Sequence, residues 1–218
     1  MIWVFSASVD EGLIVYKARL VFDVTSQSPR AGVVTFADTA RPVAWRTLLH
    51  CGAADGAEIV RRDVPNAHQS TELAPEDACY SVTRCAPGLP RYVGNKTGLL
   101  LWSKYLNGMP PAARGFSARL DRVLLEFRVD GCGFVPSVVY SRIFILSLPT
   151  GEYMYVAVIV DDMAVVTRSE GNRILNSFDE WMEQHWPGMQ RRQLHQLRVV
   201  GRVRVLSLIH ISEPTRPY

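Results

Sequence analysis

The sequence has few cysteines and no long apolar segment. Its apolar runs all fall short of the ~20 residues that a membrane-spanning helix needs, and acidic residues interrupt each of them. The first residues carry no basic start and soon meet Asp10 and Glu11, which argues against a secretory signal. The four cysteines have no CxxC spacing. We therefore expect reduced thiols, a cytoplasmic protein and no membrane contact.

An excess of one charge is also missing from most of the chain. The 218 residues carry a net charge of +3, but residues 1–187 alone carry −2 and residues 188–218 carry +5. The basic character therefore comes from the C-terminal end and does not predict a nucleic-acid surface on the main domain. With 48% apolar residues, the chain can form a core, which excludes a disordered protein.

The C-terminal end has an unusual origin. Residues 206–216 read LSLIHISEPTR, which is the translation of a common sequencing-adapter end. We expect residues 206–218 to be an artefact outside the fold and the chain to be a truncated reading frame. Residues 188–205 are a basic extension that could be genuine or frame-shifted. The fold is then expected within residues 1–187.

Apolar periodicity predicts a mixture of strands and helices. The predicted strands cover residues 3–8, 13–22, 57–64, 141–148, 153–160 and 163–167. The predicted helices begin at Pro42, at Ala112 and after a cap at Ser169. Residues 70–98 are rich in proline and glycine and are predicted to be irregular. Because no regular βαβ alternation occurs, the expected fold class is α+β.

Two adjacent acids, Asp161 and Asp162, stand between two apolar strand segments. Turn chemistry alone is the plainer explanation for them. Yet adjacent carboxylates near buried strands repel each other and lose hydration unless cations neutralise them. Hard divalent cations such as Mg²⁺ prefer such oxygen ligands. Asp63 ends another predicted strand and can supply a third carboxylate.

Several segments, in order, resemble the reverse transcriptase domain of copia-type LTR retrotransposons. WVF, D-x-G and YKARLV match the fingers hairpin of that family, and TFADTARPVAWRTLL is similar to its TFAPVARxxSxRTLL segment. DVPNAHQSTEL resembles DVxxAFLxGxL, LNGMPPAARGF resembles LYGLKQAPRxW, and YMYVAVIVDDM resembles the YVDDM motif. The similarity is collinear over residues 3–187. It implies the fingers and palm of a right-hand polymerase, with the thumb missing.

The resemblance also implies a function. The chain would be an RNA-directed DNA polymerase, a nucleotidyltransferase with two Mg²⁺ ions held by Asp63, Asp161 and Asp162, and Mn²⁺ as a substitute. One ion would activate the primer 3′-hydroxyl and the other would organise the incoming triphosphate. Lys17 and Arg19 would face that triphosphate. The implied partners are an RNA or DNA template with primer, deoxynucleoside triphosphates and the rest of the retroelement polyprotein, in a cytoplasmic virus-like particle.

The sequence departs from the family at predicted substrate-binding positions. Ile159 replaces the tyrosine before VDD, and His68 replaces the phenylalanine that screens the sugar 2′ position. Pro110 and Pro111 replace a lysine and a glutamine. Two alternatives therefore stay open: a catalytically inactive retroelement remnant with at most nucleic-acid binding, and an unrelated metal-dependent phosphohydrolase. A parent reading frame that continues intact past residue 187 would favour the enzyme.

Overall fold

The computed structural model describes residues 2–10, 13–22, 37–80, 82–84 and 99–193. The predictions for residues 194–205 and 206–218 lie outside these residues. The helices are α1 (Pro42–Ala54), α2 (Ala112–Glu126) and α3 (Arg173–His185), with 3₁₀ turns η1 (Pro75–Tyr80) and η2 (Glu170–Asn172). The strands are β1 (Ile2–Asp10), β2 (Leu13–Val21), β3 (Glu58–Asp63), β4 (Val82–Arg84), β5 (Leu99–Leu101), β6 (Arg128–Val129), β7 (Cys132–Gly133), β8 (Val135–Pro136), β9 (Ile143–Ser147), β10 (Tyr153–Ile159), β11 (Asp162–Arg168) and β12 (Gln190–Gln193).

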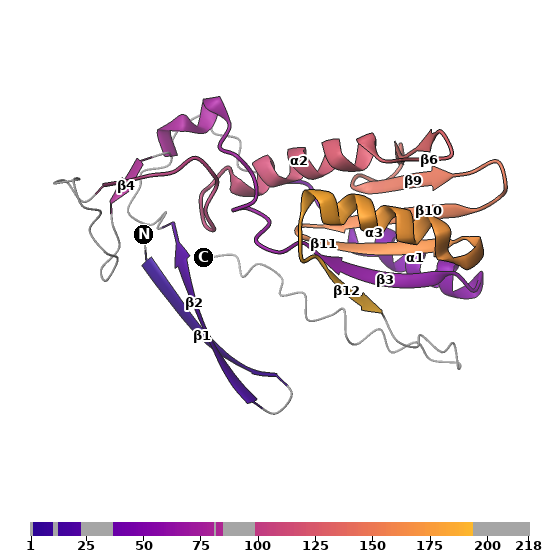
Figure 1. Cartoon of the computed structure of the whole chain (residues 1–218), viewed down its shortest axis with the longest axis horizontal. Coiled ribbons are helices and arrows are strands. Elements are labelled where there is room, and N and C mark those ends of the chain that lie inside the picture. Colours follow the sequence, from indigo (N-terminus) through magenta and orange to yellow (C-terminus); the bar gives the residue numbers. More distant parts are fainter. Residues whose placement is uncertain (1, 11–12, 23–36, 81, 85–98, 194–218) are drawn as a thin grey trace.

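A six-stranded sheet forms the body of the molecule, in the order β12-β3-β11-β10-β9-β8. Every neighbouring pair in it is antiparallel. Helix α1 packs on one face, and helices α2 and α3 pack on the other (Figure 1). Helices and an antiparallel sheet side by side are compatible with the α+β expectation.

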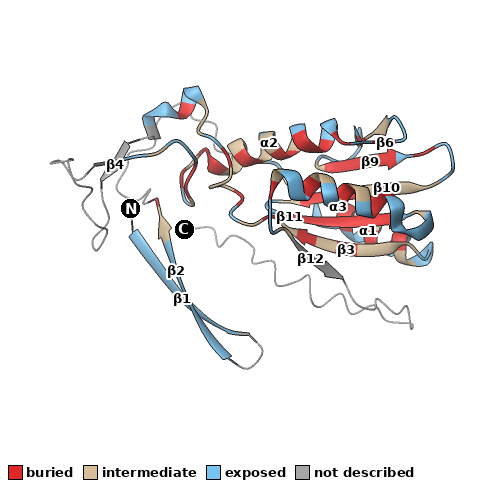
Figure 2. Ribbon diagram, viewed as in Figure 1, coloured by how far each residue is buried: buried red, intermediate tan, exposed pale blue. Residues whose placement is uncertain are grey.

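The helices follow the predicted apolar spacing. Helix α1 begins with Pro42 at its first turn and buries Ala44, Trp45 and Leu49 against the sheet. It comes so close to β11 that a Cβ at Gly52 would lie 2.3 Å from a Val166 methyl. The other face is covered by a larger cluster, whose α3 members are Ile174, Leu175, Phe178 and Met182. Figure 2 shows buried residues concentrated in the sheet and on the helix sides that face it.

Two local expectations need correction. The third helix does not begin directly after Ser169, because Gly171 (φ 58°) and Asn172 (φ 56°) adopt left-handed backbone and separate η2 from α3. The region 70–98 is also less irregular than its composition suggests. It contains η1 and β4, although residues 85–98 lie outside the described part.

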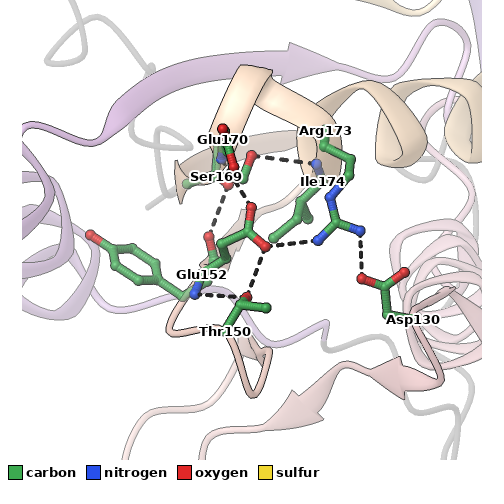
Figure 3. Close-up of polar contacts among 9 residues, drawn as sticks. Asp130, Thr150, Glu152, Ser169, Glu170, Arg173 and Ile174 are labelled. Carbon is green, nitrogen blue, oxygen red and sulfur yellow. Dashed lines mark hydrogen bonds and ion pairs between the residues drawn. The ribbon is translucent and has the colours of Figure 1, made fainter.

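Polar contacts fasten the start of α3 to the β9–β10 turn (Figure 3). Arg173 donates from one guanidinium nitrogen to Glu152 (2.7 Å) and from another to Asp130 (2.5 Å). Glu152 also accepts hydrogen bonds from the Thr150 hydroxyl (2.8 Å) and the Glu170 amide (2.9 Å). These contacts fix where the helix begins relative to the sheet.

The β1–β2 hairpin stands apart from the six-stranded sheet (Figure 1). Its strands pair in register from Ile2–Val21 to Asp10–Leu13, so that β1 is longer than the predicted strand 3–8. Nearly all of its described side chains are exposed (Figure 2). It joins the body where the Phe22 amide donates to the Asn107 carbonyl (2.8 Å). In the described part of the chain, no helix has both the length and the apolar character needed to cross a membrane.

Candidate active site

The two adjacent acids lie at a tight turn between β10 and β11. Ile159 pairs with Asp162, so Val160 and Asp161 alone form the turn. Asp162 therefore belongs to the strand and not to the turn. Strand β11 begins at Asp162, one residue before the predicted start at residue 163. Val160 has a φ of 59°, a region that costs a β-branched residue steric strain. Backbone strain of this kind persists only where the surrounding structure holds the residue in place. Strained residues are common at functional sites.

The strand register brings Asp63 to this turn. Asp63 ends β3 and lies directly opposite Asp162 on β11, which puts both side chains on the same face of the sheet. The Val64 amide donates to the Asp161 carbonyl (3.3 Å), which ties the exit of β3 to the turn. The three acids therefore sit at the adjacent ends of two neighbouring strands. That they bind metal stays a prediction.

A cation from the protein itself already contacts these acids. Arg61 lies two residues before Asp63 and so on the same face of β3. Its Nε donates to one carboxylate oxygen of Asp162 (2.9 Å), and its Nη2 donates to the other (2.5 Å). Asp162 is buried, with 8% of its surface exposed. The two-pronged ion pair compensates for the lost hydration of that carboxylate.

The charges of the three acids act on the Arg61 guanidinium. The hydrogen bond to Asp162 raises the pKa of the Arg61 guanidinium, and the charges of Asp162, Asp63 and Asp161 add to this effect. All three predicted metal ligands therefore stabilise the same positive charge. In the present arrangement the guanidinium is where a neutralising cation is expected.

The three acids suit a divalent cation in chemistry, but not in their present arrangement. Carboxylate oxygens are suitable ligands for Mg²⁺. However, no three His, Cys, Asp or Glu side chains within the described residues gather closely enough to hold a metal ion. The contact with Arg61 supplies a physical reason, because it engages both oxygens of Asp162.

The neighbouring arginine has a different role on the opposite face. Arg62 is 1% exposed and donates from Nε (2.8 Å) and Nη2 (2.5 Å) to Asp179 on α3. It thus links β3 to the helix layer. Sequence reasoning overlooked Arg61, Arg62 and Asp179. The alternation of side chains along the strand before Asp63 could have placed Arg61 on the face of the acids and Arg62 on the face of the core. No sequence pattern indicated a role for Asp179.

The structure does not gather all the predicted substrate residues around the acids. Lys17 and Arg19 lie exposed on β2, in the hairpin that stands away from the sheet (Figure 1). Ile159 ends β10 and packs against the α1 side of the sheet. It therefore adjoins the acidic turn, as its place before Val160 requires.

His68 lies in the segment after β3. Its Nδ1 is 3.0 Å from Oδ1 of Asn107, and its ring meets the Phe116 ring edge-on at a centroid distance of 6.3 Å. Its Nε2 is buried without a hydrogen-bond partner in the structure. The imidazole is thus fixed between two other segments.

Pro111 has helical backbone (φ −84°, ψ −2°) and forms the N-cap of α2.

Beside α2 lies a cavity of about 720 Å³ with several cationic side chains, among them Lys104, Arg114, Arg119 and Arg122. Arg114 is paired with Asp77 and Glu76. Arg119 stacks over the Trp186 ring at 4.8 Å, and burial lowers the pKa of its guanidinium. The cavity is separate from the acidic turn, and its lining also includes the acidic residues Glu72 and Glu76.

The chain matches no known protein-family model, and a comparison with curated proteins finds no significant relative. The interpretation of the site therefore depends on the motifs and on the geometry described above.

Proposed function

We propose that the chain is the fingers-and-palm part of an RNA-directed DNA polymerase of the copia retroelement type. Its reaction would be nucleotidyl transfer at Asp63, Asp161 and Asp162. The observation that supports this most is the register of β3 and β11, which sets Asp63 opposite Asp162 beside the strained Val160–Asp161 turn. Residues 99 positions apart in the sequence meet there, and the resemblance names the same residues.

In this proposal Mg²⁺ would be held by the three aspartates, and Mn²⁺ could substitute for it. When bound, such ions stabilise the charge that develops on the reacting oxygens in phosphoryl transfer. The chain itself contributes the placement. The β10–β11 turn exposes Asp161, whereas Asp162 is buried in the adjoining strand. Asp162 would become a ligand only after Arg61 releases its carboxylate.

The proposal also includes substrates and surroundings. The partners would be a primed RNA or DNA template, deoxynucleoside triphosphates and the remainder of the retroelement polyprotein, in the cytoplasm or in a virus-like particle. Lys17 and Arg19 would have to approach the acidic turn by movement of the hairpin. The exposure of the hairpin strands is compatible with such a movement, whereas Phe22 at their end is buried in a cluster with Tyr105 and Leu106.

Primer extension on an RNA template tests the proposal. We expect the chain to extend a primer with Mg²⁺ or Mn²⁺, weakly because Pro110 and Pro111 replace the polar motif residues, and we expect Asp161→Asn to abolish extension. Asp55→Asn is the matched control, since Asp55 is an exposed acid that pairs with Arg168 at the other end of β11. Equal activity of Asp161→Asn and Asp55→Asn would contradict the proposal.

A second candidate function is an inactive retroelement remnant that binds nucleic acid. The Arg61–Asp162 ion pair favours it, because an occupied carboxylate disfavours metal binding. The cationic cavity beside α2 adds a surface for phosphates. This alternative predicts salt-dependent binding of single-stranded RNA that Asp161→Asn leaves unchanged, with no extension even after Pro110 and Pro111 are replaced by Lys and Gln.

A further inference from the structure

Asp162 is the most restricted of the three acids. Asp161 is exposed at the turn and Asp63 is half-buried, whereas Asp162 is buried with both oxygens paired to one guanidinium. The guanidinium fork uses one lone pair on each oxygen, the pair that a metal ion bound by both oxygens would need, and its positive charge repels a cation. Binding of a metal ion by both oxygens of Asp162 therefore requires Arg61 to leave.

Arg61 can leave Asp162 without unfolding the sheet. About a quarter of its side chain (28%) is exposed, and its long flexible stem allows the charged end to move into water. Arg62, which is next to it, lacks this freedom because its side chain is 1% exposed and pinned to Asp179. The ion pair of Arg61 can therefore be displaced, whereas the ion pair of Arg62 is fixed.

We propose that Arg61 is a built-in counter-cation that occupies the aspartate cluster and must be displaced before a divalent metal ion can bind there. The inference depends on the proposed function, because it takes Asp63, Asp161 and Asp162 as the ligands. Arg61 lowers the metal affinity of the chain by competing for Asp162. When no metal is present, it offsets the charge of Asp162, one of the three carboxylates.

Binding of Mn²⁺ to the full chain, followed by electron paramagnetic resonance, tests this directly. Arg61→Gln removes the competing charge and keeps a polar side chain. Since a charged hydrogen-bonded contact corresponds to about ten-fold or more in affinity, we expect Arg61→Gln to bind Mn²⁺ at least about ten-fold more tightly than the unchanged chain. The added affinity should disappear in the double variant with Asp161→Asn. Circular dichroism establishes that each variant is folded.

Arg168→Gln is the matched control. It removes the same charge from the far end of β11, where Arg168 forms an exposed pair with Asp55. An equal gain in Arg168→Gln would overturn the inference, because the effect would then be one of net charge. Tight binding by the unchanged chain that Asp161→Asn abolishes would also overturn it, while supporting the proposed function. No Mn²⁺ binding by folded Arg61→Gln would overturn the inference, and primer extension would then decide the proposed function separately.

Discussion

The β1–β2 and β10–β11 hairpins have similar sequences and opposite surroundings. Both pair in antiparallel register, and both contain several Val residues together with Ile and Tyr. In β10 and β11, Val156, Val158 and Val165 have no exposed surface, whereas Phe5 and Tyr16 of the first hairpin are 74% and 79% exposed. Local sequence therefore determines that a hairpin forms. Its burial is determined by the helices that cover it, of which α1 and α2 come from distant parts of the chain and α3 follows β11 directly.

The same comparison separates two kinds of functional residue. The aspartates of β3 and β11 are positioned by a continuous sheet, with backbone hydrogen bonds on both sides of β11. Lys17 and Arg19 are positioned only by their own hairpin. We therefore expect substitutions in the sheet to affect stability and site geometry together, and substitutions in β1 or β2 to have little effect on stability.

The largest effect is expected in the core that covers β10 and β11. Phe178→Ala removes a fully buried ring that packs edge-on against Phe127 and Phe134. We expect the free energy of unfolding to fall by about 3–5 kcal/mol. In the exposed hairpin, Phe5→Ala should change it by no more than about 0.5 kcal/mol. Urea denaturation measures both, and similar losses would show that the hairpin is buried in solution.

A somewhat smaller loss is expected at the fixed ion pair. Arg62→Ala leaves Asp179 without its partner, which we expect to cost about 3 kcal/mol, the low end for a broken buried pair, because Asp179 is partly exposed. Arg61→Gln should cost less, because the glutamine amide can still donate a hydrogen bond to Asp162, whereas alanine at position 62 can donate none from its side chain to Asp179. If thermal denaturation showed equal losses for the two variants, Arg61 would be as fixed as Arg62.

The turn between β10 and β11 should respond in the opposite direction. Val160→Gly relieves the strain of a β-branched residue at a φ of 59°. We expect a gain of about 1 kcal/mol after the greater flexibility of glycine in the unfolded chain is counted. Denaturant titration measures this gain. A loss of stability would mean that the turn tolerates valine without strain.

The smallest effect concerns the contacts in Figure 3. The Thr150 hydroxyl, Arg173 and the Glu170 amide hold the pKa of the Glu152 carboxyl below its ordinary value of 4.5. A lowered pKa in the folded state means that the ionised group adds stability above pH 4.5, and this is lost as the pH falls through the folded-state pKa. Glu152→Gln should therefore melt slightly lower than the unchanged chain near neutrality. The difference should vanish in acid, and a difference that grew in acid would contradict the assignment.

Much of the fold could be predicted from local patterns. Pro42 and the Phe116–Leu120–Leu124 spacing indicated helices α1 and α2, and strand propensity indicated both hairpins. The meeting of Asp63 with Asp162 could be anticipated only through the family resemblance. Pairing between β3 and β11 depends on the packing of the whole sheet, which periodicity does not reveal.

The contacts of Arg61 could not be predicted in the same way. Strand alternation puts its side chain on the face of Asp63, but the partner it selects depends on the register with β11. Nothing in the sequence indicated that Lys17 and Arg19 lie apart from the acids. A hairpin carries no local signal that fixes its position relative to the rest of the chain.

The central claim is that Asp63, Asp161 and Asp162 form one cation site whose occupant at present is Arg61. Anomalous diffraction from crystals of Arg61→Gln soaked in Mn²⁺ tests it most directly. We predict an anomalous peak at the ends of β3 and β11, within coordination distance of Asp161 and at least one of the other two aspartates. Crystals of the folded variant with no peak there, or with manganese bound only elsewhere, would contradict it.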